Sequence, residues 1–523
     1  MRRRSCLLPV LFPLLAAACT TGGQVPDDHV RLVALVVVDQ LRTDLIERYD
    51  DLYSGGIRRL LDEGHVFTEA THAHAATETA PGHATLATGV HPARHGIMGN
   101  SWYEERDGEW VSVYSVEDTL AAILDDPEAP GRSYRNLLTD GLADWLRAAD
   151  PEARVVAISR KDRSAVTMGG RGGSDVYWVS AALPGLTTST AYRDTLPGWI
   201  QALNAGPVGQ LAARREWLNE SPPRAWARSR PDTAAYEGNG RETAFPHAGN
   251  SASWALNSAP YGDEAVALAA VAALRELELG RREGTDFLAV SFSQTDAVGH
   301  DYGPTSREQL DNLLRLDRLL GELFTALDEL VGEDRWVVGF SADHGVLTEP
   351  EYAAELGEPG RRVPREDRAA LTEARREALS AVGADATPAE RARRLAAAVT
   401  AVPGIAAAYT MADLLAEGES ADTFLPLYRR SFRGDRRNLF SRDPAVALRR
   451  AEGEYTGARG TSHGSPYHYD RWVPFILLGA GVPAGTGQAA VRTVDMAPTL
   501  ATLAGIPVPD GLDGRVVLPA ARR

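Results

Sequence analysis

Continuous apolar runs alternate with amphipathic, helix-like stretches along most of this chain. Residues 32–38 (LVALVVV) are rich in β-branched side chains, which is typical of a strand buried on both faces. Later runs of the same character lie at residues 154–159, 285–292, 336–340 and 472–478. Long helical patterns lie between them, and those at residues 264–279 and 307–331 are the clearest. The alternation predicts an α/β fold around a central sheet.

Acidic residues and histidines follow or precede these apolar runs. They are Asp39, Asp296, His300, Asp343, His344 and His463. Parallel strands of an α/β sheet bring their carboxyl ends to one ligand-binding edge, so we expect these side chains to converge there. Asp39 alone could equally cap a helix. The spacing of Asp296 and His300 lets both face one point if that segment is helical, and Gly345 would permit a sharp exit after His344.

A threonine stands at the predicted start of a helix in the stretch Thr77-Glu78-Thr79-Ala80-Pro81-Gly82-His83. Pro81 suits a first helical turn, which would place the Thr79 hydroxyl at the helix entry. In isolation Thr79 would be a plain helix cap. Together with three carboxylates and three imidazoles, it indicates a two-metal site with a hydroxyl nucleophile.

Two further segments could hold an anion. Asn100 lies in a glycine-flanked loop, where its amide could approach a phosphoryl oxygen, although Gly-Asn is also ordinary turn chemistry. Residues 160–163 (RKDR) follow the strand predicted at residues 154–159 and could form an anion clamp through Lys161 and Arg163. Charged segments of this kind are also common on solvated surfaces.

Five histidines between residues 72 and 95 have spacings that fit no compact ligand set. They are His72, His74, His83, His91 and His95. We interpret them as structural, or as groups that support the ligands.

Length and composition allow one large domain with insertions or two domains. We expect one domain over residues 30–515 with two insertions, followed by a tail at 516–523. The first insertion, at about 172–264, is rich in Trp, Tyr and Pro, and we interpret it as a cap outside the sheet. A carbohydrate-binding module is the alternative for its aromatic residues. The second insertion, at about 349–458, begins with charged, Ala-rich helical sequence, and residues 401–409 within it could form a strand.

The amino terminus resembles an export signal. Three arginines, a short apolar core and three alanines make residues 1–18 a predicted signal peptide, and the apolar core is too short to span a membrane. Cys19 follows, as in a bacterial lipobox, so residues 19–29 would be a lipoprotein-like tether; plain secretion is the alternative. We expect export to the periplasm or outer membrane. Cys6 and Cys19 are the only cysteines, so the mature chain cannot form an intrachain disulfide.

The charge balance bears on partners. The formal net charge is −16, from 55 basic and 71 acidic residues. This excess of negative charge argues against nucleic acid as a partner. A lipid on Cys19 would be the sole membrane contact, and oligomeric state stays open.

The motifs, in this order, resemble the alkaline phosphatase superfamily, most closely its PafA-type, phosphate-irrepressible alkaline phosphatases, sisters of the nucleotide pyrophosphatase/phosphodiesterases. The segments that carry the resemblance are Val38-Asp39-Gln40-Leu41-Arg42, Thr79-Ala80-Pro81-Gly82-His83, Asp296-x-x-x-His300, Asp343-His344-Gly345 and His463-Gly464-Ser465. The resemblance implies a doubly wound, mostly parallel sheet flanked by helices, with cap insertions.

The same resemblance implies two zinc ions. Asp296, His300 and His463 would hold one; Asp39, Asp343 and His344 would hold the other, which also meets the Thr79 oxygen. The expected activity is hydrolysis of small phosphate monoesters through a phosphothreonine at Thr79, with Asn100, Lys161 and Arg163 binding the phosphoryl group.

The motifs give weaker support to other activities. A phosphodiesterase or nucleotide pyrophosphatase is the alternative within the superfamily, and an inactive binding lipoprotein is a remote one. A sulfatase is set aside, because Thr79-Ala80-Pro81-Gly82-His83 lacks the Cys or Ser, and the Arg, of the sulfatase motif.

Overall fold

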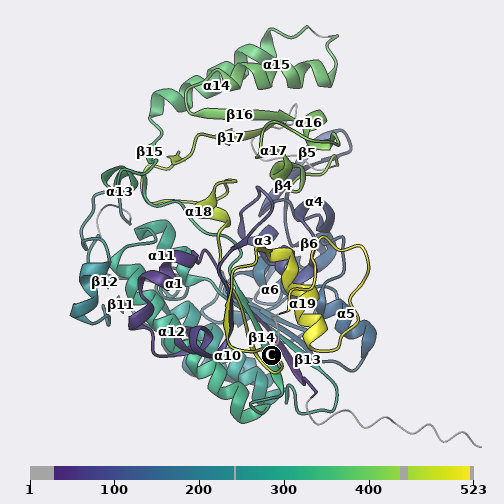
Figure 1. Cartoon of the computed structure of the whole chain (residues 1–523), viewed down its shortest axis with the longest axis vertical. Helices are drawn as coiled ribbons and strands as arrows, with labels where there is room; N and C mark the ends of the chain where they lie inside the picture. Colours follow the sequence, from purple (N-terminus) through teal and green to yellow (C-terminus); the bar gives the residue numbers. More distant parts are fainter. Residues whose placement is uncertain (1–28, 239, 241–242, 384, 436–445, 519–523) are drawn as a thin grey trace, which may run out of the picture.

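The computed structural model describes residues 29–518 except 239, 241–242, 384 and 436–445. A nine-stranded sheet forms its centre (Figure 1). In spatial order the strands are β10 (Leu186–Thr187), β9 (Asp175–Val179), β8 (Val155–Ser159), β13 (Asp286–Phe292), β1 (Leu32–Val38), β14 (Trp336–Ser341), β19 (Phe475–Gly479), β2 (His65–Phe67) and β20 (Gly485–Gly487). Strands β9, β8, β13, β1 and β14 are parallel, whereas β10, β19 and β2 make antiparallel pairs. The predicted α/β, mostly parallel sheet is confirmed.

Helices cover both faces of the sheet, as Figure 1 shows. One face packs against α2 (Gly56–Glu63), α10 (Tyr261–Glu276) and α12 (Arg307–Leu330), and the other against α3 (Thr79–Thr88), α5 (Leu142–Ala149), α6 (Asp162–Gly169) and α19 (Met496–Leu503). Strand β1 shows how the sequence directs this: Leu32 and Val36 join the first core, whereas Val33 and Val37 join the second. Successive strand side chains point to opposite faces, so a wholly apolar strand is buried on both.

The parallel register brings the strand ends together. Val38 at the end of β1 is paired with Phe292 at the end of β13, and Val37 is paired with Ser341 of β14. Ser159 of β8 lies beside Ser291. The residues that follow these strands therefore emerge at one edge of the sheet, where α/β folds bind their ligands.

The prediction that residues 172–264 lie outside the sheet is wrong in part. Strand β9 belongs to the sheet and is completely buried, and β10 extends the edge. Tyr177 and Trp178 are aromatic residues that favour a strand, but their polar and glycine-rich flanks hid the pattern. The segment also contains the helices α7 (Gly198–Ala205), α8 (Pro207–Ala212) and α9 (Ala252–Asn257), which pack against α10.

The aromatic residues of this segment serve largely as core. Trp217 is buried, packs on Phe245 and donates a hydrogen bond to Asp311, 2.8 Å away. This is what structural packing predicts, and it gives no support to a carbohydrate-binding module.

The second insertion forms a separate layer, at the top of Figure 1. Strand β16 (Ile405–Thr410) pairs with β17 (Val446–Arg450), beneath the helices α14 (Arg365–Ser380) and α15 (Pro388–Thr400). The strand predicted at residues 401–409 is therefore present. We call β16, β17 and the α14–α15 pair the upper layer.

Two hairpins were not predicted. They are β4 (Ser101–Arg106) with β5 (Glu109–Tyr114), and β6 (Glu117–Ile123) with β7 (Asp126–Arg132). Their strands are largely half-exposed and mix polar with apolar residues, so they lack the apolar runs that mark the central strands.

The remaining small elements connect these layers. They are α1 (Thr43–Arg48), β3 (Ala70–Thr71), α4 (Pro92–His95), β11 (Glu216–Trp217), β12 (His247–Ala248), α11 (Gln294–Tyr302), α13 (Pro350–Glu355), β15 (Arg361–Arg362), α16 (Met411–Leu415), α17 (Leu425–Arg429), β18 (Glu454–Tyr455), α18 (His468–Arg471) and β21 (Val491–Arg492).

The predicted signal peptide, Cys19 and most of the tether lie outside the described residues. Within the described part of the chain, no helix has both the length and the apolar character that a bilayer span requires.

Candidate active site

Helix α3 begins at Thr79, as predicted, and the threonine is almost fully buried, with 1% of its surface exposed. Gly82, one turn along, lies against the backbone of Asp343: a Cβ at Gly82 would stand 2.1 Å from the Asp343 carbonyl oxygen. A glycine is needed for this close approach. It fixes the start of α3 against the end of β14.

Two cations converge on the Thr79 hydroxyl. Lys161 Nζ lies 3.3 Å and Arg163 Nη2 lies 3.4 Å from Thr79 Oγ1. Both come from the segment that follows β8 and opens α6, so their position depends on the parallel register described above. The structure therefore brings Lys161, Arg163 and Thr79 together.

Asn100 lies at the start of α3 and is held there from two sides. Its Oδ1 accepts a hydrogen bond from the backbone N–H of Ala80 (2.9 Å), and its own N–H donates to Glu78 Oε2 (2.8 Å). Because Oδ1 is engaged by the helix, the Nδ2 group is the part of the amide that remains to donate to a ligand. Burial raises the pKa of Glu78, and the hydrogen bond from the Asn100 N–H partly offsets this rise.

Arg163 is positioned by residues that no sequence pattern had indicated. Its Nη1 donates to Tyr114 Oη (3.4 Å), and that hydroxyl donates to Asp162 (2.5 Å). Arg132 Nε donates to the other oxygen of Asp162 (2.6 Å). Tyr114 and Arg132 come from the two unpredicted hairpins, so the hairpins help to hold the arginine.

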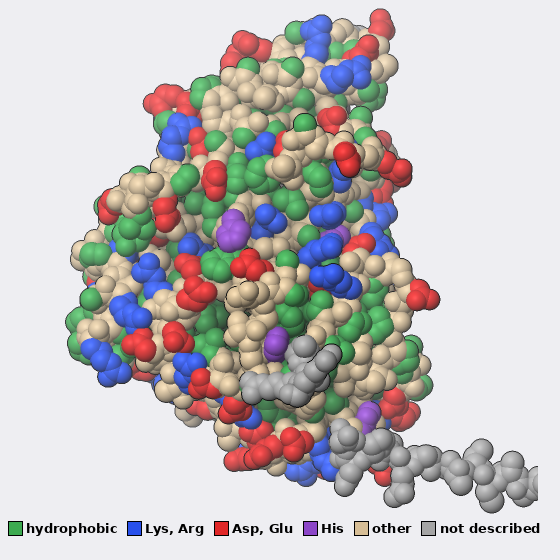
Figure 2. All heavy atoms as spheres, viewed as in Figure 1, with side chains coloured by type: hydrophobic (Ala, Val, Ile, Leu, Met, Phe, Trp, Pro, Cys, Tyr) green, Lys and Arg blue, Asp and Glu red, His purple; other side chains and the backbone are tan. Residues whose placement is uncertain are grey.

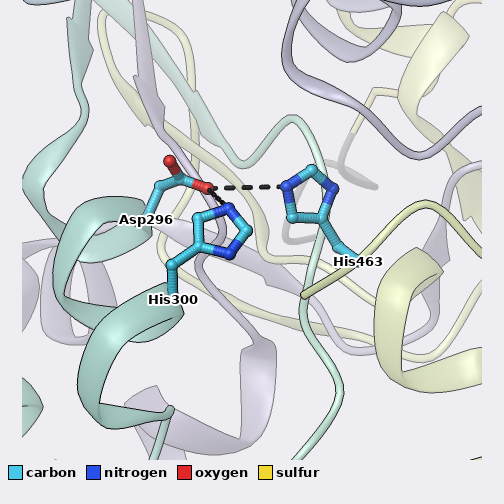
Figure 3. Close-up of side chains that lie close together, drawn as sticks. All are labelled: Asp296, His300 and His463. Atoms are coloured by element: carbon cyan, nitrogen blue, oxygen red, sulfur yellow. Dashed lines mark ion pairs between the residues drawn. The ribbon is translucent and has the colours of Figure 1, made fainter. Parts of the chain in front are cut away.

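Asp296, His300 and His463 form one cluster (Figure 3). Asp296 and His300 share a face of α11, as their spacing predicts, with His300 Nε2 3.1 Å from Asp296 Oδ1. His463 comes from the loop before β19 and brings its Nε2 to 3.6 Å from the same oxygen. Three ligand atoms that converge on one point could hold a metal ion.

A second cluster adjoins the first. Ligand atoms of Asp39, His344 and Asp296 lie within 4.8 Å of one another, and His344 Nε2 is 3.5 Å from both Asp39 Oδ1 and Asp343 Oδ2. The rings of His344 and His463 stack with centroids 3.6 Å apart, which joins the two clusters. Asp296 therefore belongs to both clusters, whereas the prediction assigned it only to the set with His300 and His463.

The imidazoles of both clusters are oriented by the backbone. The Nδ1 atoms of His300, His344 and His463 lie 2.9, 2.9 and 2.7 Å from carbonyl oxygens of Thr461, Gly345 and Thr77. An Nδ1–H bonded to a carbonyl leaves the Nε2 lone pair to bind a metal.

Several buried donor atoms of the second cluster have no hydrogen-bond partner in the described structure. They are Asp39 Oδ1 and Oδ2, Asp343 Oδ2 and His344 Nε2, although Asp343 Oδ2 lies 3.2 Å from His83 Nδ1. Asp39 Oδ2 does lie 2.6 Å from Lys161 Nζ, which is also 2.6 Å from Asp296 Oδ2. Buried polar atoms without hydrogen bonds are costly, so these atoms suit metal ions.

The charges of the buried carboxylates also favour a bound cation. Burial, reinforced by the carboxylates of Asp296 and Asp343, raises the pKa of Asp39 well above its ordinary value despite Lys161. Burial opposes ionisation of Asp296 too, but the charges of Lys161 and His300 hold its pKa well below the usual range. One lysine thus does not neutralise three carboxylates, and further positive charge is needed to hold all of them ionised.

The surroundings of two of the histidines favour the neutral imidazole. Burial lowers the pKa of His344, and burial with the neighbouring imidazoles lowers that of His463 well below its ordinary value. For His300 burial acts in the same direction, but the Asp296 carboxylate outweighs it and raises the pKa. A neutral imidazole is the form that binds a metal.

Gly345 does not play the predicted part of a sharp turn. It is absent from the residues with positive φ, and a Cβ there would lie 2.1 Å from the Tyr469 carbonyl oxygen. The glycine is needed because the backbone after His344 packs directly on the segment before β19.

Gln40 contacts the site but was not selected as a site residue from the sequence. It donates from its backbone N–H to Asp343 Oδ1 (3.0 Å) and from Nε2 to Asp296 Oδ1 (2.8 Å), so it links two of the predicted ligands. Its φ of 69° is left-handed, which is uncommon outside glycine. Its place directly after Asp39 was the only available signal.

Among the histidines of residues 72–95, His83 contacts the site. His83 Nδ1 lies 3.2 Å from Asp343 Oδ2, and its Nε2 lies 2.8 Å from Ser291 Oγ. His72 and His74 contact each other, with 3.1 Å between ring nitrogens. Neither ligand cluster includes any of these histidines.

On the surface, histidine, acidic and basic side chains lie side by side just below the upper layer (Figure 2). Elsewhere on the protein, a groove of about 1030 Å³ lies between α10 and α12, but none of its lining residues belongs to the candidate active site. Volume therefore does not identify the active site.

Comparisons with known proteins agree with this geometry. The family model for type I phosphodiesterase / nucleotide pyrophosphatase matches residues 33–421. Alkaline phosphatase PhoK of Sphingomonas sp is 30% identical over 524 residues, which cover 93% of this chain and 90% of PhoK. PhoV of Synechococcus elongatus is 34% identical over 332 residues, which cover 62% of this chain and 60% of PhoV.

A solved structure is similar over almost the whole molecule. The crystal structure of wild-type alkaline phosphatase PafA matches with a TM-score of 0.84 and 26% sequence identity, covering 94% of this chain and 99% of PafA. The chain therefore belongs to the type I phosphodiesterase / nucleotide pyrophosphatase family, within which it is an alkaline phosphatase-like phosphoesterase.

Proposed function

We propose that the protein is an exported phosphomonoesterase that releases inorganic phosphate through a covalent phosphothreonine at Thr79. The observation that carries the proposal is the approach of Lys161 Nζ and Arg163 Nη2 to within 3.3 and 3.4 Å of Thr79 Oγ1. A monoester presents a dianionic group whose three non-bridging oxygens all accept hydrogen bonds. Two cations and the Asn100 amide suit that group.

The site also fits two metal ions, which we propose to be zinc. Asp296, His300 and His463 supply one donor set, and Asp39, Asp343 and His344 supply the other. Zinc takes imidazole nitrogen and carboxylate oxygen in just such sets of three. When bound, the ions would supply Lewis acidity and positive charge to the reacting oxygens.

The residues themselves account for the order of bond changes. Lys161 and Arg163 both donate toward Oγ1, which favours the deprotonated hydroxyl. Thr79 Oγ, whose proton has passed to solvent, attacks phosphorus; the bond from phosphorus to the alcohol oxygen breaks, and that oxygen leaves with the electron pair and takes a proton from water. A water molecule then attacks phosphorus and gives a proton to the hydroxide left by that transfer, the bond to Oγ breaks, and phosphate leaves with the deprotonated Thr79 Oγ restored.

Transition-state charge would be held by the same donors throughout. Asn100 Nδ2, Lys161 and Arg163 are fixed before substrate arrives, by Ala80, Asp296 and Tyr114 respectively. Donors fixed in advance cost no reorganisation during the reaction, which is the basis of electrostatic catalysis.

Acid quenching during turnover of an aryl phosphate tests the covalent step. We expect a phosphorylated peptide that contains Thr79, because phosphate esters of threonine survive acid. Thr79→Ala, treated in the same way, provides the control and should give no such peptide. Phosphate found on another residue, or on none while turnover is fast, would contradict the covalent route.

Metal content gives a second prediction. Fully active protein should contain about two zinc ions per chain, and chelation should abolish activity and lower the melting temperature, since an ion that binds only the folded state stabilises it. Thr79→Ala should keep both ions, whereas His300→Ala should lose about one of them. Full activity with fewer than about two equivalents would refute the bimetal site.

We also propose export with lipid attachment at Cys19. The predicted signal peptide and the alanines before Cys19 support this proposal. Mass spectrometry of the protein from its native membrane should show a lipid-modified Cys19 as the first residue, and Cys19→Ala should release the protein from the membrane fraction. An unmodified amino terminus at another position would show plain secretion or no processing there.

Phosphodiesterase activity remains the second candidate function, because the matching family model carries that name. Lys161 and Arg163 count against it, since a diester replaces one charged oxygen by a neutral alkoxy arm. The inactive-lipoprotein reading finds no support, because the nucleophile and every proposed ligand are present.

A further inference from the structure

Gln40 directly follows the proposed ligand Asp39 and adopts a backbone conformation that glutamine does not favour. Its φ of 69° is left-handed. The other two non-glycine residues with a positive φ in the described part of the chain, Asp107 and Glu278, are exposed, whereas Gln40 is 1% exposed. Strained backbone clusters at functional sites, and the contacts that Gln40 makes give a reason for the strain.

The Gln40 amide holds one particular oxygen of Asp296. Gln40 Nε2 lies 2.8 Å from Asp296 Oδ1, and an ionised carboxylate only accepts hydrogen bonds, so the NH₂ group is the end of the amide that faces it. The same oxygen lies 3.1 Å from His300 Nε2 and 3.6 Å from His463 Nε2. Gln40 therefore donates to the Asp296 oxygen that the first cluster offers to a metal ion.

The orientation of Asp296 matters because this residue lies within reach of the donor atoms of both clusters. Lys161 Nζ holds the other carboxylate oxygen, Oδ2, at 2.6 Å. With Oδ2 bound to the lysine and Oδ1 bound to Gln40, the carboxylate is fixed with Oδ1 toward His300 and His463. Hydrogen bonds to metal-ligating groups orient them in this way.

The space that the Gln40 amide occupies depends on a glycine in α11. A Cβ at Gly299 would lie 1.9 Å from Gln40 Oε1. Glycine is unfavourable inside a helix, and the close approach of the amide accounts for it here. Gln40 Oε1 is buried and has no hydrogen-bond partner among the described residues, which is costly. An apolar side chain of similar size would suit packing alone better, so the donor of the amide is the reason for a glutamine.

The backbone of Gln40 reaches the second cluster. Its N–H donates to Asp343 Oδ1, 3.0 Å away. This contact does not involve the side chain, so a glycine at position 40, which accepts a left-handed φ without strain, should keep it. The two contacts of Gln40 can therefore be separated by substitution.

We propose that Gln40 is a positioning residue: its amide fixes Asp296 Oδ1 toward His300 and His463 and thereby sets the metal affinity of that site. The inference rests on the proposed two-metal site and identifies the residue that assigns Asp296 to one of the two ions. Removing a group that hydrogen-bonds a metal ligand typically weakens metal binding about 10- to 100-fold.

Zinc titration of metal-free protein, in competition with a chromophoric chelator, measures the dissociation constants of both sites. We expect Gln40→Gly to raise one constant about tenfold or more and to leave the other within about threefold, since the N–H to Asp343 remains. His300→Ala identifies the affected site, because it removes a ligand of the first cluster. In that background Gln40→Gly should leave the remaining constant unchanged.

Gln309→Ala is the matched control for the loss of a buried amide beside α11. Gln309 is also 1% exposed, and its Nε2 would lie 3.3 Å from a Cβ at Gly299. That nitrogen donates to the Thr295 carbonyl oxygen (2.8 Å), and Gln309 contacts no proposed ligand in the described structure. Both zinc constants should stay at their wild-type values in this variant, even where its melting temperature falls.

Gln40→Asn provides a second variant, because asparagine also tolerates a left-handed φ but is one methylene too short to make the same contact. It should raise the same constant as Gln40→Gly. Wild-type constants in both Gln40 variants, or an equal rise in Gln309→Ala, would overturn the proposal. Wild-type protein that binds fewer than about two zinc ions per chain would instead refute the bimetal site itself, and that result is visible before any variant is made.

Discussion

Thr79→Ala is expected to lower kcat/KM for a phosphate monoester by roughly 10³-fold or more, because it removes the attacking oxygen. The side chain is nearly fully buried but small, and its hydroxyl makes only the contacts to Lys161 and Arg163 among those found in the described structure. The fold and phosphate binding should therefore survive, as measured by melting temperature and by inhibition with inorganic phosphate.

Thr79→Ser is the matched variant, since it keeps the hydroxyl and loses one methyl group. It should retain a substantial part of the activity. If Thr79→Ala turned over at near wild-type rate, water would have to attack phosphorus directly, and Thr79 would be no more than the first residue of α3.

The double change Lys161→Ala and Arg163→Ala should reduce monoester kcat/KM by several orders of magnitude. A donor fixed against charge that develops in the transition state contributes about 2.7–4 kcal/mol, or roughly 10²–10³ in rate. Diester cleavage should fall much less, because a diester offers these cations one oxygen fewer. Steady-state kinetics on both substrates with the same double variant measures the difference.

Arg160→Ala is the control for the loss of positive charge. Arg160 directly precedes Lys161, but its Nη1 donates to Asn257, 3.3 Å away, and it does not contact Thr79 in the described structure. It should change monoester hydrolysis far less than the double variant. Equal losses on monoester and diester in the double variant would remove the reason for preferring a monoesterase.

The sequence was sufficient to predict the strongly apolar central strands and the residues at their ends. Strand β1 is apolar throughout, so burial on both faces follows from composition, and Asp39 then falls at the ligand edge. The helical spacing of Asp296 and His300 likewise fixes their common face on α11.

Residues that act across the fold could not be found in this way. Gln40 links Asp343 and Asp296, which are 303 and 256 residues away along the chain. Tyr114 and Arg132 reach the Arg163 segment from two hairpins with no strong apolar pattern. Contacts of this kind join residues that are far apart along the chain, so the local spacing of apolar residues does not predict them.

The sequence predicted the edge of the sheet at which Lys161 lies, but not its contacts there. Its place after β8 pointed to the ligand edge, but nothing in its neighbourhood indicated contacts of 2.6 Å with both Asp39 and Asp296. The same lysine therefore touches both proposed ligand sets and the nucleophile. This observation makes it central to the choice between substrate classes.

That choice is tested most directly by steady-state kinetics of the wild-type enzyme on a monoester and a diester of the same alcohol, with matched metal content. The account predicts that kcat/KM for the monoester exceeds that for the diester by about 10²-fold or more, as expected when two extra charged contacts act on one group. A wild-type enzyme that prefers the diester would contradict the account and make the protein a phosphodiesterase.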